Sequence, residues 1–132
     1  TVGGNGFLES ANHTHVNVES GRAIVNDDCI VELYNGALVV KGNSMVKECR
    51  AATTLALYGT SVAHIGTTYR QEIYATDGAT VVIHDNPNDL ECLILSKNAR
   101  AITPTGRAIK PVNADKFKVV ACKDGMRKIV AR

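Results

Sequence analysis

The sequence contains no tryptophan, and aromatic residues make up only 5% of its 132 residues. Any core must therefore be built from aliphatic side chains, in a chain long enough for one domain and a small appendage. No apolar run approaches the roughly 18 residues that a membrane-spanning helix needs, and no basic segment followed by an apolar one opens the chain. We expect a soluble protein without a membrane partner. The sequence leaves open whether a leader segment has been removed.

Closely spaced cysteines are also absent. The four cysteines, Cys29, Cys49, Cys92 and Cys122, lie twenty or more residues apart, whereas zinc knuckles and redox motifs place them about two to four residues apart. We predict that all four are free thiols. This favours assembly in a reducing cytoplasm.

Signatures of catalysis are missing from the sequence. No serine or cysteine lies in a nucleophile elbow, and the glycines near the N-terminus neither follow a strand nor open a helix, as a phosphate loop would require. His84 precedes Asp85, but neighbouring residues of a strand point to opposite faces, so this carboxylate is not expected to orient the imidazole. We predict that the protein is not an enzyme and has no resident cofactor.

Three columns of residues recur along the first two-thirds of the chain, at steps of six to ten residues with a mean of about eight. The first holds mostly small residues: Thr14, Ala23, Cys29, Ala37, Ser44, Thr53, Ser61, Gln71 and Ala79. Two places later comes an aliphatic column: Val16, Val25, Val31, Val39, Val46, Leu55, Ala63, Ile73 and Val81. The third, two places further on, is mostly apolar but includes Asp27, Lys41 and Glu48. Since residues two positions apart share a face of a strand, the columns are expected to point inward from many short strands.

Glycine, asparagine and aspartate mark the returns between these units, as at Asn35-Gly36 and Asp77-Gly78. The pattern predicts an all-β fold, a short parallel β-helix or β-solenoid of about nine or ten strand units over residues 13–98. Residues 1–12, in which glycines cluster, are expected to form a flexible lead-in. Prolines break residues 99–132 into a basic linker, followed by a C-terminal β-hairpin around Asp124-Gly125 that caps the last coil or joins a neighbour's sheet.

Charge is divided unevenly along the chain. Residues 1–98 carry six basic and eleven acidic residues, a net charge of −5, whereas residues 99–132 carry nine and two, a net charge of +7. The basic tail includes Lys116, Lys118, Lys123, Arg127 and Lys128. Such a tail can bind nucleic acid, but contact with the acidic body of the same or a neighbouring subunit is the preferred interpretation.

Several residues that alternate with the inward columns are apolar, although they should face outward. The predicted interface consists of Ile24, Ile30, Leu38, Val40, Val62 and Val82. A contiguous apolar outer face marks a contact with another protein, so we expect a homo-oligomer, with a trimer as the guess. The alternatives are a one-residue slip of register in the first units, which exchanges the faces, or coverage by the C-terminal hairpin.

Two kinds of residue could bind ligands. His13 and His15, if both lie in a strand, project from one face about 7 Å apart, and three copies around a threefold axis would present six imidazoles to a transition metal; a solvated surface pair is the alternative. Tyr34, Tyr58, Tyr74 and His84 could line an outward surface on which sugar rings stack, or the tyrosines could simply cover the corners.

Two stretches of the chain resemble a known repeat. Ala79-Thr80-Val81-Val82-Ile83-His84-Asp85-Asn86 and Cys29-Ile30-Val31-Glu32-Leu33-Tyr34-Asn35-Gly36 look like the degenerate Ala-Thr-Val-x-Ala-Tyr-(Gly/Asp)-Asn repeats of β-helical bacterial and bacteriophage proteins. The pair His13 and His15 resembles the His-x-His iron sites of trimeric phage fibres and spikes. The resemblance implies a structural or adhesive subunit of a phage fibre, spike or bacterial surface assembly, and hence a virion or surface location. A binding module for glycan or, less favoured, nucleic acid is the alternative.

Overall fold

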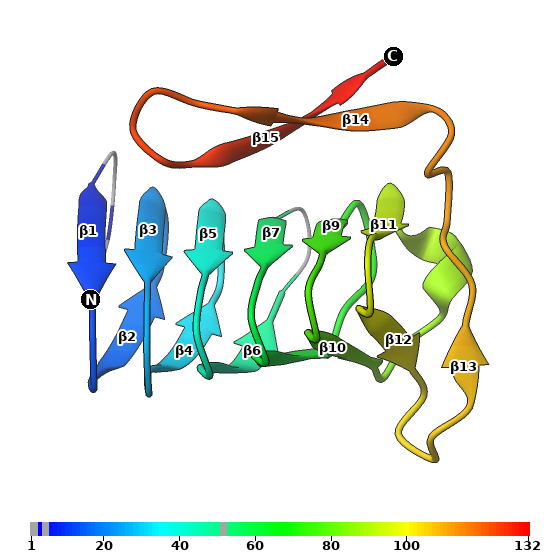
Figure 1. The fold of residues 1–132 in the computed structure, drawn as a ribbon, viewed down its shortest axis with the longest axis horizontal. Coiled ribbons are helices and arrows are strands. Elements are labelled where there is room, and N and C mark those ends of the chain that lie inside the picture. The colour runs from blue at the N-terminus through cyan, green and yellow to red at the C-terminus, as the bar shows by residue number, and fades with distance from the viewer. Residues whose placement is uncertain (1–2, 4–5, 51–52) are drawn as a thin grey trace.

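A computed structural model describes residue 3, residues 6–50 and residues 53–132 of the chain. The fold is all-β. Stacked parallel strands form a β-solenoid of about five turns, and an antiparallel hairpin follows it (Figure 1). The predicted fold class is thereby confirmed, although the number of strands differs.

Two sheets make the walls of the solenoid. The six-stranded sheet contains, in order, β1 (Phe7–Ala11), β3 (Arg22–Val25), β5 (Ala37–Val40), β7 (Thr54–Leu57), β9 (Glu72–Ala75) and β11 (Cys92–Leu95). The seven-stranded sheet contains β2 (His15–Val18), β4 (Ile30–Leu33), β6 (Met45–Cys49), β8 (Val62–Ile65), β10 (Thr80–Ile83), β12 (Arg100–Ile102) and β13 (Ala108–Ile109). Each coil thus contributes one strand to each sheet.

The solenoid is longer than predicted at both ends. Strand β1 lies within the predicted flexible lead-in and pairs in parallel with β3, and β12 lies within the predicted linker and pairs in parallel with β10. The described residues therefore supply twelve parallel strands rather than nine or ten. Clustered glycines suggested flexibility at the N-terminus, but Leu8 and Ala11 pack against the core between the sheets.

The core between the two sheets is aliphatic, as the composition requires. Its residues include Val16, Val25, Val31, Val46, Leu55, Ile73 and Val81, all members of the predicted inward column. Cys29 and Cys49 are buried in the same core, and all four cysteines are free thiols, as predicted. Burial raises the pKa of the Cys49 and Cys92 thiols to about 12, so very little of either is in the reactive thiolate form at neutral pH.

Along the solenoid, one half of each coil keeps a constant number of residues and the other half becomes longer. From the six-stranded to the seven-stranded sheet, the step between equivalent inward residues is always eight, as from Ala23 to Val31. The return step grows from seven residues in the first coils to twelve in the last, between Val81 and Leu93. The coils therefore lengthen along the solenoid at one set of corners only.

The unequal steps explain an error in the predicted register. An eight-residue step from Val31 reaches Val39, but the true step is seven, so Leu38 and Val40 point into the core while Val39 points out. A slip of one residue exchanges the faces of a strand. The prediction that Leu38 and Val40 belong to an outer interface was therefore wrong.

Residues that broke the predicted columns have specific places in the structure. Asp27 and Lys41 are exposed at corners just beyond β3 and β5, so they do not enter the core. Gln71 is fully buried, but its Oε1 accepts from the backbone N–H of Thr53 and its Nε2 donates to the carbonyl of Arg50. A buried amide that is satisfied in this way is tolerated in a core.

Small residues stack at the tight corner that leads into the seven-stranded sheet. The backbone N–H of Cys29 donates to Ser44 Oγ, and that of Ser44 donates to Ser61 Oγ, each at 3.1 Å. Each coil is thus hydrogen-bonded through a side chain of the next one. This explains the short hydroxyl side chains of Ser44 and Ser61 in the first column of the repeat.

The chain after β12 closes the last coil and then turns back. Strand β13 pairs antiparallel with β12, and Val112 forms a bridge to Leu93. Residues 108–112 therefore cover the end of the solenoid, which capping by the hairpin, one of its two expected roles, would have covered. The hairpin, β14 (Phe117–Ala121) and β15 (Arg127–Ala131), instead lies across the six-stranded sheet (Figure 1). The one helix among the described residues is a single 3₁₀ turn, Pro87–Asp89, and no described helix could cross a membrane.

Candidate binding surfaces

The C-terminal hairpin is attached to the six-stranded sheet by apolar contacts. Met126 at its tip packs on the outward side chains Ile24, Val39 and Ala56, and all four are buried. Predicted interface residue Ile24 is therefore covered by the chain's own hairpin. This was one of the alternatives left open by the sequence.

The ion pair between hairpin and solenoid has its charges the other way round from the expected ones. This pair joins Asp124 of the basic tail to Arg22 of the acidic body. The guanidinium of Arg127 lies 5.7 Å from the centre of the Tyr58 ring, a cation–π contact. Among the described residues, the lysines of the hairpin make no ion pair with the body, so the expected contact between basic tail and acidic body is not seen there.

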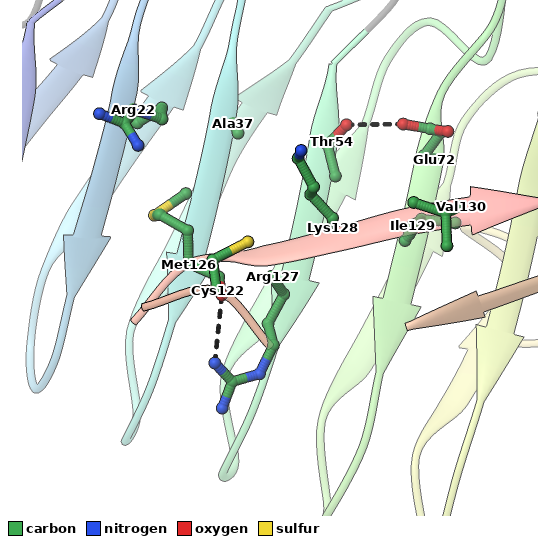
Figure 2. Close-up of a pocket in the computed structure, with 10 residues that line it drawn as sticks. All are labelled: Arg22, Ala37, Thr54, Glu72, Cys122, Met126, Arg127, Lys128, Ile129 and Val130. Atoms are coloured by element: carbon green, nitrogen blue, oxygen red, sulfur yellow. Dashed lines mark hydrogen bonds between the residues drawn. The ribbon is translucent and has the colours of Figure 1, made fainter. Parts of the chain in front are cut away.

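A groove of about 360 Å³ runs between the hairpin and the sheet (Figure 2). Its floor is a row of side chains in register at the start of four adjacent strands, Arg22, Ala37, Thr54 and Glu72. Thr54 Oγ1 donates to Glu72 Oε1 at 2.7 Å. The other wall is formed by Cys122 and by residues 126–130 of the hairpin. This volume lies at the small end of the range for binding sites.

Strand β15 presents an unpaired edge to this groove. At the two ends of the hairpin, Cys122 N–H donates to the Met126 carbonyl and Arg132 N–H donates to that of Lys116, both at 2.9 Å. Paired residues in an antiparallel ladder alternate between bonded and non-bonded pairs. The N–H and C=O groups of Arg127, Ile129 and Ala131 therefore point away from β14. Within the described part of the chain, no strand pairs with this edge.

The predicted basic residues lie mostly on the hairpin surface. Lys116, Lys118, Lys123 and Lys128 are exposed, while Arg127 is half-buried against Tyr58. Lys118 is paired with Val130, and Lys128 with Val120. Since directly opposed residues share a face, Lys118 and Lys128 lie on the same face of the hairpin, and Lys128 also lines the groove.

The three predicted tyrosines do not form one row. Tyr58 and Tyr74 meet edge to face on the six-stranded sheet, with ring centres 5.9 Å apart, beside the hairpin. Tyr34 follows β4 of the other sheet, where its hydroxyl donates to Glu32 and its ring lies under the guanidinium of Arg50. The expected platform for sugar rings is therefore split between two faces.

The outer face of the seven-stranded sheet carries the uncovered part of the predicted interface. Ile30 and Met45 are 46% and 43% exposed, and register places Ile30, Met45 and Val62 side by side on β4, β6 and β8. Val62 and Val82 are half-buried. This apolar row, Ile30, Met45 and Val62, lies on the face opposite the hairpin.

His13 and His15 do not share a strand. Strand β2 begins at His15, and His13 lies in a bend with φ of 50°. His13 Nδ1 lies 3.0 Å from Asp28, and His15 Nε2 lies 3.6 Å from Glu32. No group of three metal-ligating side chains occurs among the described residues. The assumption that strand geometry places both imidazoles on one face is wrong, and metal binding between subunits stays a prediction.

The imidazole of His84 lies beside that of His64, a contact that was not predicted from the sequence. Its Nε2 lies 3.0 Å from Nδ1 of His64. Burial lowers the pKa of His64, and the charge of His84 lowers it further. Asp85 accepts instead from the backbone N–H and hydroxyl of Thr68, each at 3.2 Å, so it does not orient His84.

The groove beside β15 was not predicted, because its two walls are separated by about half the chain in sequence. A signal was present: Met126 and Ile129 are apolar within a basic hairpin, and both are buried. Comparisons of the chain with protein-family models, curated proteins and solved structures gave no match. Its function must therefore be argued from its own residues.

Proposed function

We propose that this chain is a non-enzymatic structural module that associates with other subunits through the outer face of its seven-stranded sheet. The supporting observation is the apolar row Ile30, Met45 and Val62, of which Ile30 and Met45 are 46% and 43% exposed. An exposed apolar patch on a soluble domain marks an interaction site. On a stacked parallel sheet, such a row is held rigidly by the ladder on both sides.

The assembly we propose for this face is a homo-oligomer of three copies. The repeats that the sequence resembles occur in bacterial and bacteriophage proteins, so a fibre, a spike or a bacterial surface structure is the proposed setting. In that role the solenoid would act as a rigid spacer, and its corners and hairpin would remain available to other partners.

Light scattering coupled to size-exclusion chromatography tests this proposal. The unmodified chain is expected to elute as an oligomer, and Met45→Lys should convert it to a monomer because it places a charge in the apolar row. The matched control is Val120→Lys, which changes an apolar side chain of similar exposure, 38%, on the hairpin. A clean monomer of the unmodified chain at high concentration would contradict the proposal.

Binding of nucleic acid by the hairpin is a second candidate function. It is favoured by the exposure of four hairpin lysines, Lys116, Lys118, Lys123 and Lys128. Each phosphate contact releases counterions, so affinity should fall steeply with salt. Binding of a single-stranded oligonucleotide that is insensitive to salt, or unchanged in Lys118→Glu with Lys128→Glu, would argue against it.

A further inference from the structure

We propose that the groove beside β15 binds an extended segment of a partner protein, which adds to the free edge of β15 as a third strand of the hairpin sheet. The backbone groups of Arg127, Ile129 and Ala131 that point away from β14 supply the hydrogen-bonding edge. Strand addition of this kind draws affinity from main-chain hydrogen bonds and specificity from alternate side chains. The site lies on the face opposite the apolar row and does not depend on it.

The dimensions of the groove match a short strand. Five residues of β15 extend over about 13 Å, at roughly 3.3 Å per residue. The floor from Arg22 to Glu72 crosses four strands, whose spacing of about 4.8 Å gives roughly 14 Å. A segment of four or five residues can therefore lie along β15 for its whole length and remain on the floor.

Side chains around the groove define the chemistry of the segment. A residue of the segment that is hydrogen-bonded to the backbone of Ile129 would lie on the same face of the hairpin sheet as the Ile129 side chain. Its side chain would therefore point toward the floor of the groove, onto the short side chains Ala37 and Thr54. Its neighbours would share the outward face of Lys128. Opposite charges on one face of paired strands attract. The fitting segment is therefore apolar at alternate positions and acidic between them.

A second copy of the chain does not fit this site in antiparallel pairing. If the β15 strands of two copies paired antiparallel, a twofold axis perpendicular to the joined sheet would relate the copies. Both solenoids would then lie on the same side of that sheet. The second solenoid would then occupy the space of Ala37 and Thr54, which is already filled by the first. A free segment carries no such body, so charge and shape both favour a partner's extended chain.

Titration with a model peptide, followed by amide chemical shifts, tests the proposal. The probe is a six-residue peptide of alternating glutamate and valine with blocked ends. Shifts are expected at residues 127–131 and at Ala37, Thr54 and Glu72, and the reaction of Cys122 with a thiol reagent should slow because its side chain lines the groove. The same peptide with alternate backbone nitrogens methylated should not bind, since it lacks the donors for the ladder.

Two pairs of variants separate the groove from the rest of the surface. Thr54→Arg fills the floor and should abolish binding, whereas Thr80→Arg changes an equally half-buried threonine on the other sheet and should not. Lys128→Glu should weaken binding by about two- to fivefold, and Lys118→Glu, on the strand away from the groove, should leave it unchanged. Lys128 is exposed, so this variant will fold.

Several outcomes would overturn the proposal. These are the absence of shifts with the peptide, equal binding of the methylated peptide, equal effects of Lys128→Glu and Lys118→Glu, or shifts at the β15 edge that depend on protein concentration without peptide. The last would mean that a second copy occupies the edge. Met45→Lys should not alter peptide binding, so failure here is distinguishable from failure of the assembly proposal.

Discussion

The imidazoles of His64 and His84 meet nitrogen to nitrogen across β8 and the end of β10. The two nitrogens are 3.0 Å apart, while the ring centres are 5.3 Å apart with planes inclined by 39°, so the rings are not stacked. One ring must donate and the other accept. Two protonated rings cannot keep this contact, because both nitrogens would then be donors.

Stability should consequently fall in mild acid. The pKa of His64 in the folded chain is below its usual value of 6.5, so the unfolded chain binds more protons in the window just below that pH. The free energy of unfolding should therefore decrease as the pH falls through this window. Urea unfolding at pH 7.5 and 5.5 measures the decrease, which should be smaller in His64→Gln. An equal decrease in both proteins would exclude His64 as its source.

Replacement of Leu38 tests the corrected register of β5. Leu38→Ala should lower the free energy of unfolding by about 2–5 kcal/mol, because the side chain is buried between the sheets. Ile30→Ala, at a position that the sequence pattern grouped with it, should change stability by only about 0.5 kcal/mol because Ile30 is exposed. Similar losses for the two variants would mean that the register described for β5 is incorrect.

Gly36 is expected to resist replacement for two reasons. Its φ is 101°, which disfavours any side chain, and an added Cβ would overlap the carbonyl oxygen of Gly21 in the coil before it. Gly106 has a similar φ of 90° but open space around it. Thermal unfolding should show a loss from strain of about 1–3 kcal/mol in Gly106→Ala, and a clearly larger loss in Gly36→Ala.

The hairpin should detach when its apolar anchor is removed. Met126→Ala empties the contact with Ile24, Val39 and Ala56, whereas Val120→Ala removes an exposed side chain from the other strand. Hydrogen exchange should become faster over residues 117–131 in the first variant and stay unchanged in the second. Exchange in β4 and β8 should be preserved in both, because those strands lie on the opposite sheet.

Thiol labelling should single out Cys122. It is half-buried, whereas the other three cysteines are buried, and the pKa of Cys49 and Cys92 is raised to about 12 by burial. Since the thiolate is the reactive form, one thiol per folded chain should react quickly. Cys122→Ser should remove that fast reaction, and four thiols should react in the unmodified chain after unfolding.

Sequence periodicity was sufficient to predict the solenoid but not its exact register. Apart from Val39, the aliphatic column from Val16 to Val81 follows directly from alternation within strands, as do the buried small residues Ser44 and Ser61. The face of Leu38 could not be obtained in this way. Its position depends on a seven-residue corner, and the length of a corner is set by turn packing rather than by alternation.

The binding surfaces were predictable only in part. Ile30 could be assigned to an outer face from the local pattern alone, and the structure leaves it exposed there. The contact of His64 with His84, the separation of Tyr34 from Tyr58, and the groove beside β15 depend on which coils are neighbours. That information is absent from any single repeat, because it is fixed by the number of residues in every preceding coil.

The lengthening of the coils makes the two ends of the solenoid unequal in perimeter. A coil near β1 takes fifteen residues, from Leu8 to Ala23, and one near β11 takes twenty, from Ile73 to Leu93. Copies stacked end to end would have to match these unlike outlines, and the longer corners would leave backbone groups unpaired. Growth into a filament along the solenoid axis is therefore disfavoured by shape alone, which leaves sideways contact as the geometry open to assembly.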